Sequence, residues 1–201
     1  MSGHTAKSLF DLNIQGAEQC VKIYDGVLQL GSSLNLEWLL RSAIMLAVSA
    51  MDAYFHDKVR YRAARFASAP PPRHLANLKI PLSEVRKWDE AGRKGNVIRR
   101  WVVKHLETRP LQSSNAIAEA LKLVGIQSFW NTIEPDNSAR DALLTCLNKL
   151  VERRNQIAHE GDRLRSRSSG KSLRPITHNY AVQAIEFVKD LIQKTEDSFP
   201  R

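Results

Sequence analysis

The sequence is poor in the residues that form disulfides and metal sites. It has only two cysteines, Cys20 and Cys146, which lie far apart in apolar patterns of helical spacing, as reduced core cysteines do. His56 and His74 have no second histidine or cysteine at ligand spacing, and no glycine-rich phosphate loop is present. We therefore expect no disulfide, no metal and no cofactor.

Long hydrophobic runs are also missing. No segment has 18 consecutive apolar residues, and the first ten residues lack the basic start and continuous apolar core of a signal peptide. We therefore expect a soluble protein of the reducing cytoplasm with no membrane partner. The alternation of apolar and polar residues that indicates a β-strand is absent as well. The sequence thus predicts an all-α fold.

What the chain does contain is apolar residues at helical spacing. Long core helices are predicted at about 36–66, 139–160 and 177–197, and an earlier helix over most of residues 1–30. Shorter helices are predicted within 67–135, which we interpret as a helical insertion between the long helices. A hydrophobic content of 43% over 201 residues is sufficient for one domain with its own core.

Positive charge exceeds negative charge. The chain has 30 lysines and arginines against 21 acidic residues, which gives a net charge of +9 and predicts attraction to a polyanion. Part of this excess lies in 163–174, a polar stretch that we expect to form a mobile basic loop. The loop has no acidic residue and favours a phosphate-bearing partner. Its basic residues are Arg163, Arg165, Arg167, Lys171 and Arg174.

The apolar stripe of the helix predicted at 139–160 ends in polar residues. One helical face carries Leu143, Leu147, Leu150, Val151, Arg154 and Ala158. Arg154 thus stands where a buried side chain is expected, so it either pairs inside the protein or faces a polar cleft or a subunit interface. His159 lies about 140° further round the helix. The two residues can meet through a bend near the helix end or across a two-fold axis.

Arginine and histidine have the chemistry that metal-independent RNA cleavage requires. Histidine exchanges protons near neutrality, so His159 is the candidate general base or acid at the 2′-OH. Arginine stays charged and its planar fork matches phosphate oxygens, so Arg154 is the candidate for stabilising the phosphate charge. Asn155 would position them. The candidate RNA-binding residues are Arg153, Arg163, Arg165, Arg167 and Lys171.

The same residues resemble a known family. Arg154-Asn155-x-x-x-His159 is similar to the Arg-polar-x(3–5)-His motif of the HEPN superfamily. Its setting, LVERRNQIAHEGD, and the upstream segment SAMDAYFHD at 49–57 resemble the RiboL-PSP-type HEPN domains over about residues 36–195. The resemblance implies one HEPN-like helical bundle over 1–201. It also implies a homodimeric endoribonuclease that leaves a 2′,3′-cyclic phosphate and acts as a toxin or in defence or stress.

Two other interpretations stay open. In the first, Arg154 pairs with a buried acid, for which Asp52 is the obvious candidate, and His159 only caps the helix. Asp52 could hold Arg154 by a salt bridge in an active enzyme too. In the second, the chain is a non-catalytic HEPN module that binds RNA or protein.

A regulatory protein or antitoxin is an expected partner. Two further alternatives are weaker. Control by a nucleotidyltransferase is disfavoured, because Gly161 stands where that group of HEPN proteins has a tyrosine. A DNA-binding helix-turn-helix between Ser113 and Trp130 would present the apolar segment IQSFW, which is a poor recognition face. RNA, whether tRNA or single-stranded, remains the expected substrate.

Overall fold

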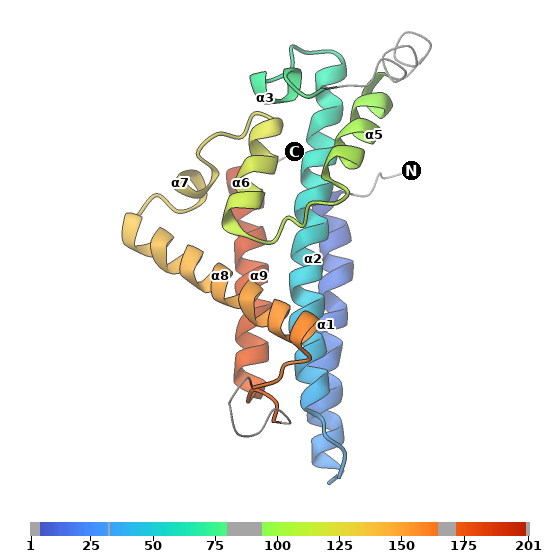
Figure 1. The fold of residues 1–201 in the computed structure, drawn as a ribbon, viewed down its shortest axis with the longest axis vertical. Helices are drawn as coiled ribbons and strands as arrows, with labels where there is room; N and C mark the ends of the chain where they lie inside the picture. The colour runs from blue at the N-terminus through green and yellow to red at the C-terminus, as the bar shows by residue number, and fades with distance from the viewer. Residues whose placement is uncertain (1–4, 32, 80–93, 165–171, 200–201) are drawn as a thin grey trace.

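The computed structural model describes residues 5–31, 33–79, 94–164 and 172–199, and in these residues the chain is all-α, as expected (Figure 1). Four long helices are present: α1 (Ala6–Gln29), α2 (Glu37–Ala63), α8 (Asn137–Glu160) and α9 (His178–Ser198). The shorter ones are η1 (Ala64–Ala67), α3 (Arg73–Ala76), α5 (Lys94–Leu106), α6 (Ser114–Leu123) and α7 (Phe129–Ile133). The short helix predicted to start at Pro81 falls outside the described residues.

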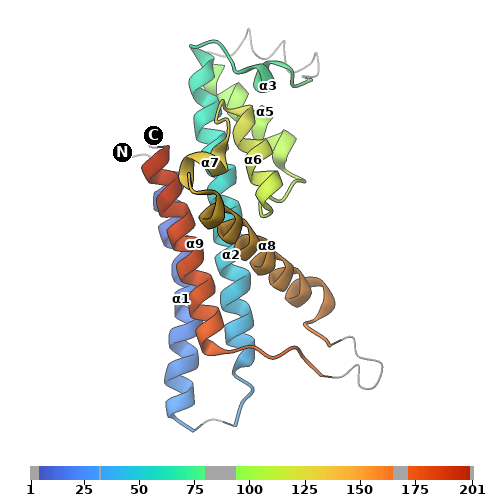
Figure 2. The same cartoon turned by 90° about the vertical axis from the view of Figure 1, so that its left-hand side faces the viewer.

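Helix α2 is the centre of the fold. Helices α1 and α9 run along it lengthwise, and all three pairs are in contact (Figures 1 and 2). Apolar residues surround α2 on nearly all sides, and Ala47, Val48 and Phe55 are fully buried. By length and composition, Glu37–Ala67 could cross a membrane, but more than half of its apolar window is buried inside the protein. This burial is what the core helix of a bundle shows.

The shorter helices gather at one end of α2 (Figure 1). Helix α5 packs on α2 and η1, and α6 packs on α2 and α3. Helix α7 contacts α9, where the ring of Phe129 lies 5.8 Å from that of Phe199 and 5.9 Å from that of Phe55. This apolar packing holds α7, the helix that directly precedes α8.

Helix α8 is packed against the protein in its middle and partly exposed in its last turns. Asp136 caps its start by accepting a hydrogen bond from the N–H of Ala139, and the helix then crosses α2 obliquely (Figure 1). Its buried residues are Leu143, Leu147, Leu150 and Val151, all in the stripe predicted from the sequence. None of the residues of α8 after Val151 is buried. Its last turns are therefore held at the edge of the protein.

Candidate functional site

The three predicted catalytic residues lie at the exposed end of α8. Arg154 is half-buried, whereas Asn155 and His159 are exposed. One guanidinium nitrogen of Arg154, Nη1, donates to Oδ1 of Asn155 at 3.1 Å, and its buried Nε has no partner. Within the described part of the chain His159 makes no hydrogen bond and no ion pair. The motif thus presents a cation and an imidazole whose hydrogen-bonding groups are largely unused.

The apolar stripe ends earlier than the sequence predicts. Ala158, which shares the predicted core face with Arg154, is exposed. The reason is that the last turns of α8 run away from α1, α2 and α9 (Figure 2). Arg154 therefore lies at the margin of the core, with its Nε inside and its Nη1 bound to the exposed Asn155.

Asp52 does not pair with Arg154, so that interpretation is wrong. Its carboxylate accepts hydrogen bonds from Leu111 N–H at 2.6 Å and from Gln112 Nε2 at 3.1 Å, and it lies 3.5 Å from His56 Nε2. Burial raises the pKa of Asp52, but the bonds from His56, Gln112 and Leu111 outweigh it and hold the pKa below the usual range. Asp52 therefore holds the chain that leads into α6.

Arg153, one of the predicted RNA-binding residues, binds other residues of the protein. Both of its terminal nitrogens bind the carboxylate of Asp162, with Nη2 2.9 Å from Oδ2, and its side chain is only 12% exposed. Nη2 also donates to the carbonyl of Pro175 at 3.2 Å. These internal bonds use both terminal nitrogens of Arg153, and its predicted RNA contact stays a prediction.

The carboxylate that holds Arg153 also binds a buried arginine of α2. Arg41 Nε lies 2.6 Å from Asp162 Oδ2, and the side chains of Arg41 and Asp162 are 1% and 0% exposed. The other guanidinium nitrogens of Arg41 bind Glu37 at 2.9 Å and the carbonyl of Arg174 at 2.7 Å. We call Arg41, Arg153 and Asp162 the buried charge cluster. It joins the start of α2, the end of α8 and the segment leading into α9.

Sequence reasoning missed two members of this cluster. Arg41 interrupts a helix that is otherwise apolar nearly all round, which is the signal a buried ion pair leaves in a sequence. Asp162 follows Gly161, the residue that ends α8 in a left-handed conformation with φ +59°. The sequence does not show which residues the side chain after such a turn will meet, so the partners of Asp162 could not be predicted.

The basic loop is described only at its two ends. Arg163 is exposed, while Arg165, Arg167 and Lys171 lie outside the described residues. Arg163 and Leu173 form an antiparallel bridge, and Leu164 N–H donates to the carbonyl of Ser172 at 2.8 Å. The loop therefore begins and ends beside the last turn of α8. The predicted RNA contact of Arg163 stays a prediction.

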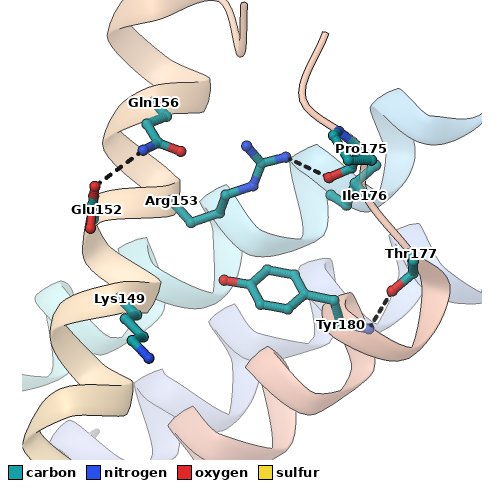
Figure 3. Close-up of a pocket in the computed structure, with 8 residues that line it drawn as sticks. All are labelled: Lys149, Glu152, Arg153, Gln156, Pro175, Ile176, Thr177 and Tyr180. Atoms are coloured by element: carbon teal, nitrogen blue, oxygen red, sulfur yellow. Dashed lines mark hydrogen bonds between the residues drawn. The ribbon is translucent and has the colours of Figure 1, made fainter. Parts of the chain in front are cut away.

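An open cavity of about 400 Å³ lies beside the motif, between α8 and the start of α9 (Figure 3). Figure 3 shows the ring of Tyr180 pointing with its hydroxyl toward α8. Burial raises the pKa of Tyr180 against the opposing charge of Arg153, so this hydroxyl stays a donor at neutral pH. The lining residues are Lys149, Glu152, Arg153, Gln156, Pro175, Ile176, Thr177 and Tyr180. The cavity provides polar groups next to the motif helix.

An all-helical bundle that presents Arg-Asn-x-x-x-His at the exposed end of a long helix has the features of a HEPN domain. The RiboL-PSP-HEPN family model matches residues 17–200, and the chain belongs to this family. The match covers most of α1 as well as the region that carries the motif. No curated protein and no solved structure matches the chain. Membership of this family supports a role in RNA cleavage or RNA binding.

Proposed function

We propose that this protein is a metal-independent endoribonuclease that cleaves RNA to a 2′,3′-cyclic phosphate at a composite site in a homodimer. One observation carries the proposal. The end of α8 presents a half-buried arginine with an unpartnered Nε beside an exposed histidine, and the fold uses neither of them for an ion pair within the described residues. A buried N–H without a partner is costly, as at Arg154, and the exposed imidazole of His159 is accessible to a ligand.

The chemistry assigns one role to each residue. His159 takes the proton of the 2′-OH, the 2′-oxygen forms a bond to phosphorus, and the bond to the 5′-oxygen breaks. The guanidinium of Arg154 stabilises the charge that develops on the phosphorane oxygens. Asn155 orients Arg154 through the 3.1 Å hydrogen bond to Nη1. The leaving 5′-oxygen needs a proton in return.

The need for both a base and an acid supports the dimer. One protomer supplies a single histidine at the motif, so a second copy related by a two-fold axis would supply the histidine that protonates the leaving oxygen. The half-buried Ile157 and the exposed Ala158 lie between Arg154 and His159 and offer an apolar contact for that second copy. Each copy would then contribute the same residues to both halves of the site.

Charge and composition support RNA, such as a tRNA or a single-stranded RNA, as the substrate. The net charge of +9 attracts a polyanion, and the exposed Arg163 lies four residues after His159. We infer a cytoplasmic role as a toxin or as an effector in defence or stress. An antitoxin or another regulatory protein would restrain such an activity.

The decisive test is cleavage of end-labelled tRNA and single-stranded RNA in EDTA. Wild-type protein should release cyclic-phosphate products, and His159→Ala and Arg154→Ala should each lower the rate by about 10²-fold or more. His74→Ala, which changes an exposed histidine on α3, is the matched control and should cleave like wild type. Light scattering on each protein shows whether the dimer is present.

A non-catalytic RNA-binding module is the second candidate, and the positive charge around the loop favours it. In that case wild-type protein would bind RNA at low salt and leave every RNA intact. Binding would weaken steeply with salt, because phosphate contacts release counterions. Cleavage that survives in both motif variants would instead place the chemistry elsewhere in the protein.

A further inference from the structure

Asp162 lies three residues after His159 and is completely buried. Its carboxylate receives one arginine from each of two helices, Arg41 from α2 at 2.6 Å and Arg153 from α8 at 2.9 Å. A buried carboxylate with two guanidinium partners has its hydrogen-bonding capacity occupied on both oxygens. The side chain therefore has a narrowly determined position.

The backbone of Asp162 is fixed as firmly as its side chain. Its N–H donates to the carbonyl of Gln156 at 2.9 Å, and its carbonyl accepts from Arg174 N–H at 2.8 Å. Its φ of +57° follows the φ of +59° at Gly161, so two consecutive residues are left-handed. Aspartate adopts this conformation more readily than most residues other than glycine, but it does so mainly where its side chain finds hydrogen-bonding partners nearby. The contacts of the buried charge cluster hold the turn in it.

Stability alone does not explain this arrangement. Removing two arginines and a carboxylate from water is costly, and apolar replacements of such clusters are often equally stable. What a buried ion pair provides is a specific geometry, because the charges must meet at defined distances and angles. Here the geometry that it defines is the angle between the last turn of α8 and the start of α2.

We propose that Asp162 is a positioning residue for the candidate catalytic histidine. Together with Arg41 and Arg153 it fixes the turn that ends α8, and through that turn it sets where His159 is presented to RNA. The expected effect on cleavage rests on the proposed function. The expected effect on the position of His159 does not. Arg174 reinforces the turn, because its guanidinium binds Glu160 at 3.2 Å and its carbonyl accepts from Arg41.

The test compares Asp162→Asn with wild type by two readouts. Asparagine keeps the size of the side chain and removes its charge. We expect the kcat for RNA cleavage to fall by about 10-fold or more, with KM changed by less than about 2-fold, since small misplacements of a catalytic group lower kcat. In NMR spectra the imidazole resonance of His159, assigned by its loss in His159→Gln, should shift or broaden.

Glu196→Gln is the matched control. Glu196 is a half-buried carboxylate of α9 that binds Lys58 at 2.8 Å and Tyr54 at 2.5 Å, far along the chain from the motif. Its replacement should lower the unfolding temperature without moving the His159 resonance or kcat. An equal change of both readouts in this control would show that general destabilisation is responsible, and the proposal would fail.

The remaining outcomes are also decisive. If Asp162→Asn does not fold, Arg41→Lys, which keeps the charge but loses the planar fork, takes its place with the same readouts. If the folded variant leaves both the His159 resonance and kcat unchanged, Asp162 is not a positioning residue. If wild-type protein cleaves no RNA, the proposed function has failed, and the resonance of His159 alone decides the positioning.

Discussion

The two sides of the last turns of α8 differ in how their charges are used. On one side Arg153 is 12% exposed and bound to a carboxylate that is completely buried. On the other side its neighbour Arg154 donates a hydrogen bond to Asn155, and its buried Nε has no partner among the described residues. Two adjacent arginines on one helix thus have opposite environments. The fold uses the first for its own structure, and we propose that the second binds the phosphate of RNA.

This difference shows how a narrow site is kept in place at the edge of a bundle. Among the described residues, Asn155, Ala158 and His159 on the side of α8 away from the buried charge cluster are exposed, and we propose that they face RNA or a second copy of the chain. The same exposure would leave the helix end poorly fixed. The buried charge cluster on the opposite side supplies the constraint that apolar packing supplies elsewhere in the protein.

The sharpest test of the difference is a pair of stability measurements. Asp162→Ala leaves two buried guanidinium groups without their carboxylate and should lower the free energy of unfolding by about 3–5 kcal/mol. Arg154→Ala removes no ion pair and should change it by less than about 1 kcal/mol. Urea denaturation of both variants measures these values. Similar losses in the two variants would break the comparison.

The next prediction concerns Arg154→Met, which should affect RNA cleavage and not stability. Arg154→Met keeps the apolar stem and removes a buried N–H without a partner, so the protein should be as stable as wild type or slightly more stable. Single-turnover cleavage should fall by about 10²–10³-fold, the usual loss when one group that stabilises transition-state charge is removed. Arg154→Lys should recover little, because an ammonium lacks the bidentate fork.

A large loss of stability in Arg154→Met would contradict this expectation. It would mean that Arg154 holds the fold together, as Arg153 does. The two sides of the helix would then be equivalent, and the role of Arg154 in phosphate binding would lose its support.

Much of the fold follows from local patterns in the sequence. Helices predicted at about 36–66, 139–160 and 177–197 are present at Glu37–Ala63, Asn137–Glu160 and His178–Ser198, because apolar spacing is a local property. The predicted helix over residues 1–30 runs through Gly16 and Gly26 without a break, since packing against α2 offsets their low helix propensity.

The partners of the charged residues did not follow from the sequence. Asp52 and Arg154 each lie in a segment that resembles the HEPN family. Asp52 nevertheless binds Leu111 and Gln112, which lie in a different part of the chain. Arg41 and Asp162 are 121 residues apart and meet only because α8 ends beside the start of α2. Which of two adjacent arginines meets Asp162 depends on the rotation of α8 about its axis, and one apolar stripe in the sequence defines that rotation too coarsely.

The smallest predicted effect concerns Asp52 and tests whether it belongs to the site. Its pKa is lowered in the folded protein, so the ionised carboxylate stabilises the fold at pH values above its unfolded pKa of about 4. This contribution is lost as the pH falls through the lowered pKa. Asp52→Asn should therefore cost about 1 kcal/mol at pH 7, and the difference from wild type should shrink as the pH falls from the unfolded pKa through the lowered pKa of the folded protein.

Urea denaturation of the Asp52→Asn variant between pH 2.5 and 7 checks this pH dependence. The matched change Asp57→Asn should not reproduce it. Burial raises the pKa of Asp57, so the pH dependence of its contribution to stability has the opposite sign. Cleavage by Asp52→Asn at pH 7 should equal that of wild type, since the carboxylate binds the chain before α6 and not Arg154. A loss of cleavage as large as that of Arg154→Met would place Asp52 in the site after all. The buried charge cluster would then not be the main support of the motif.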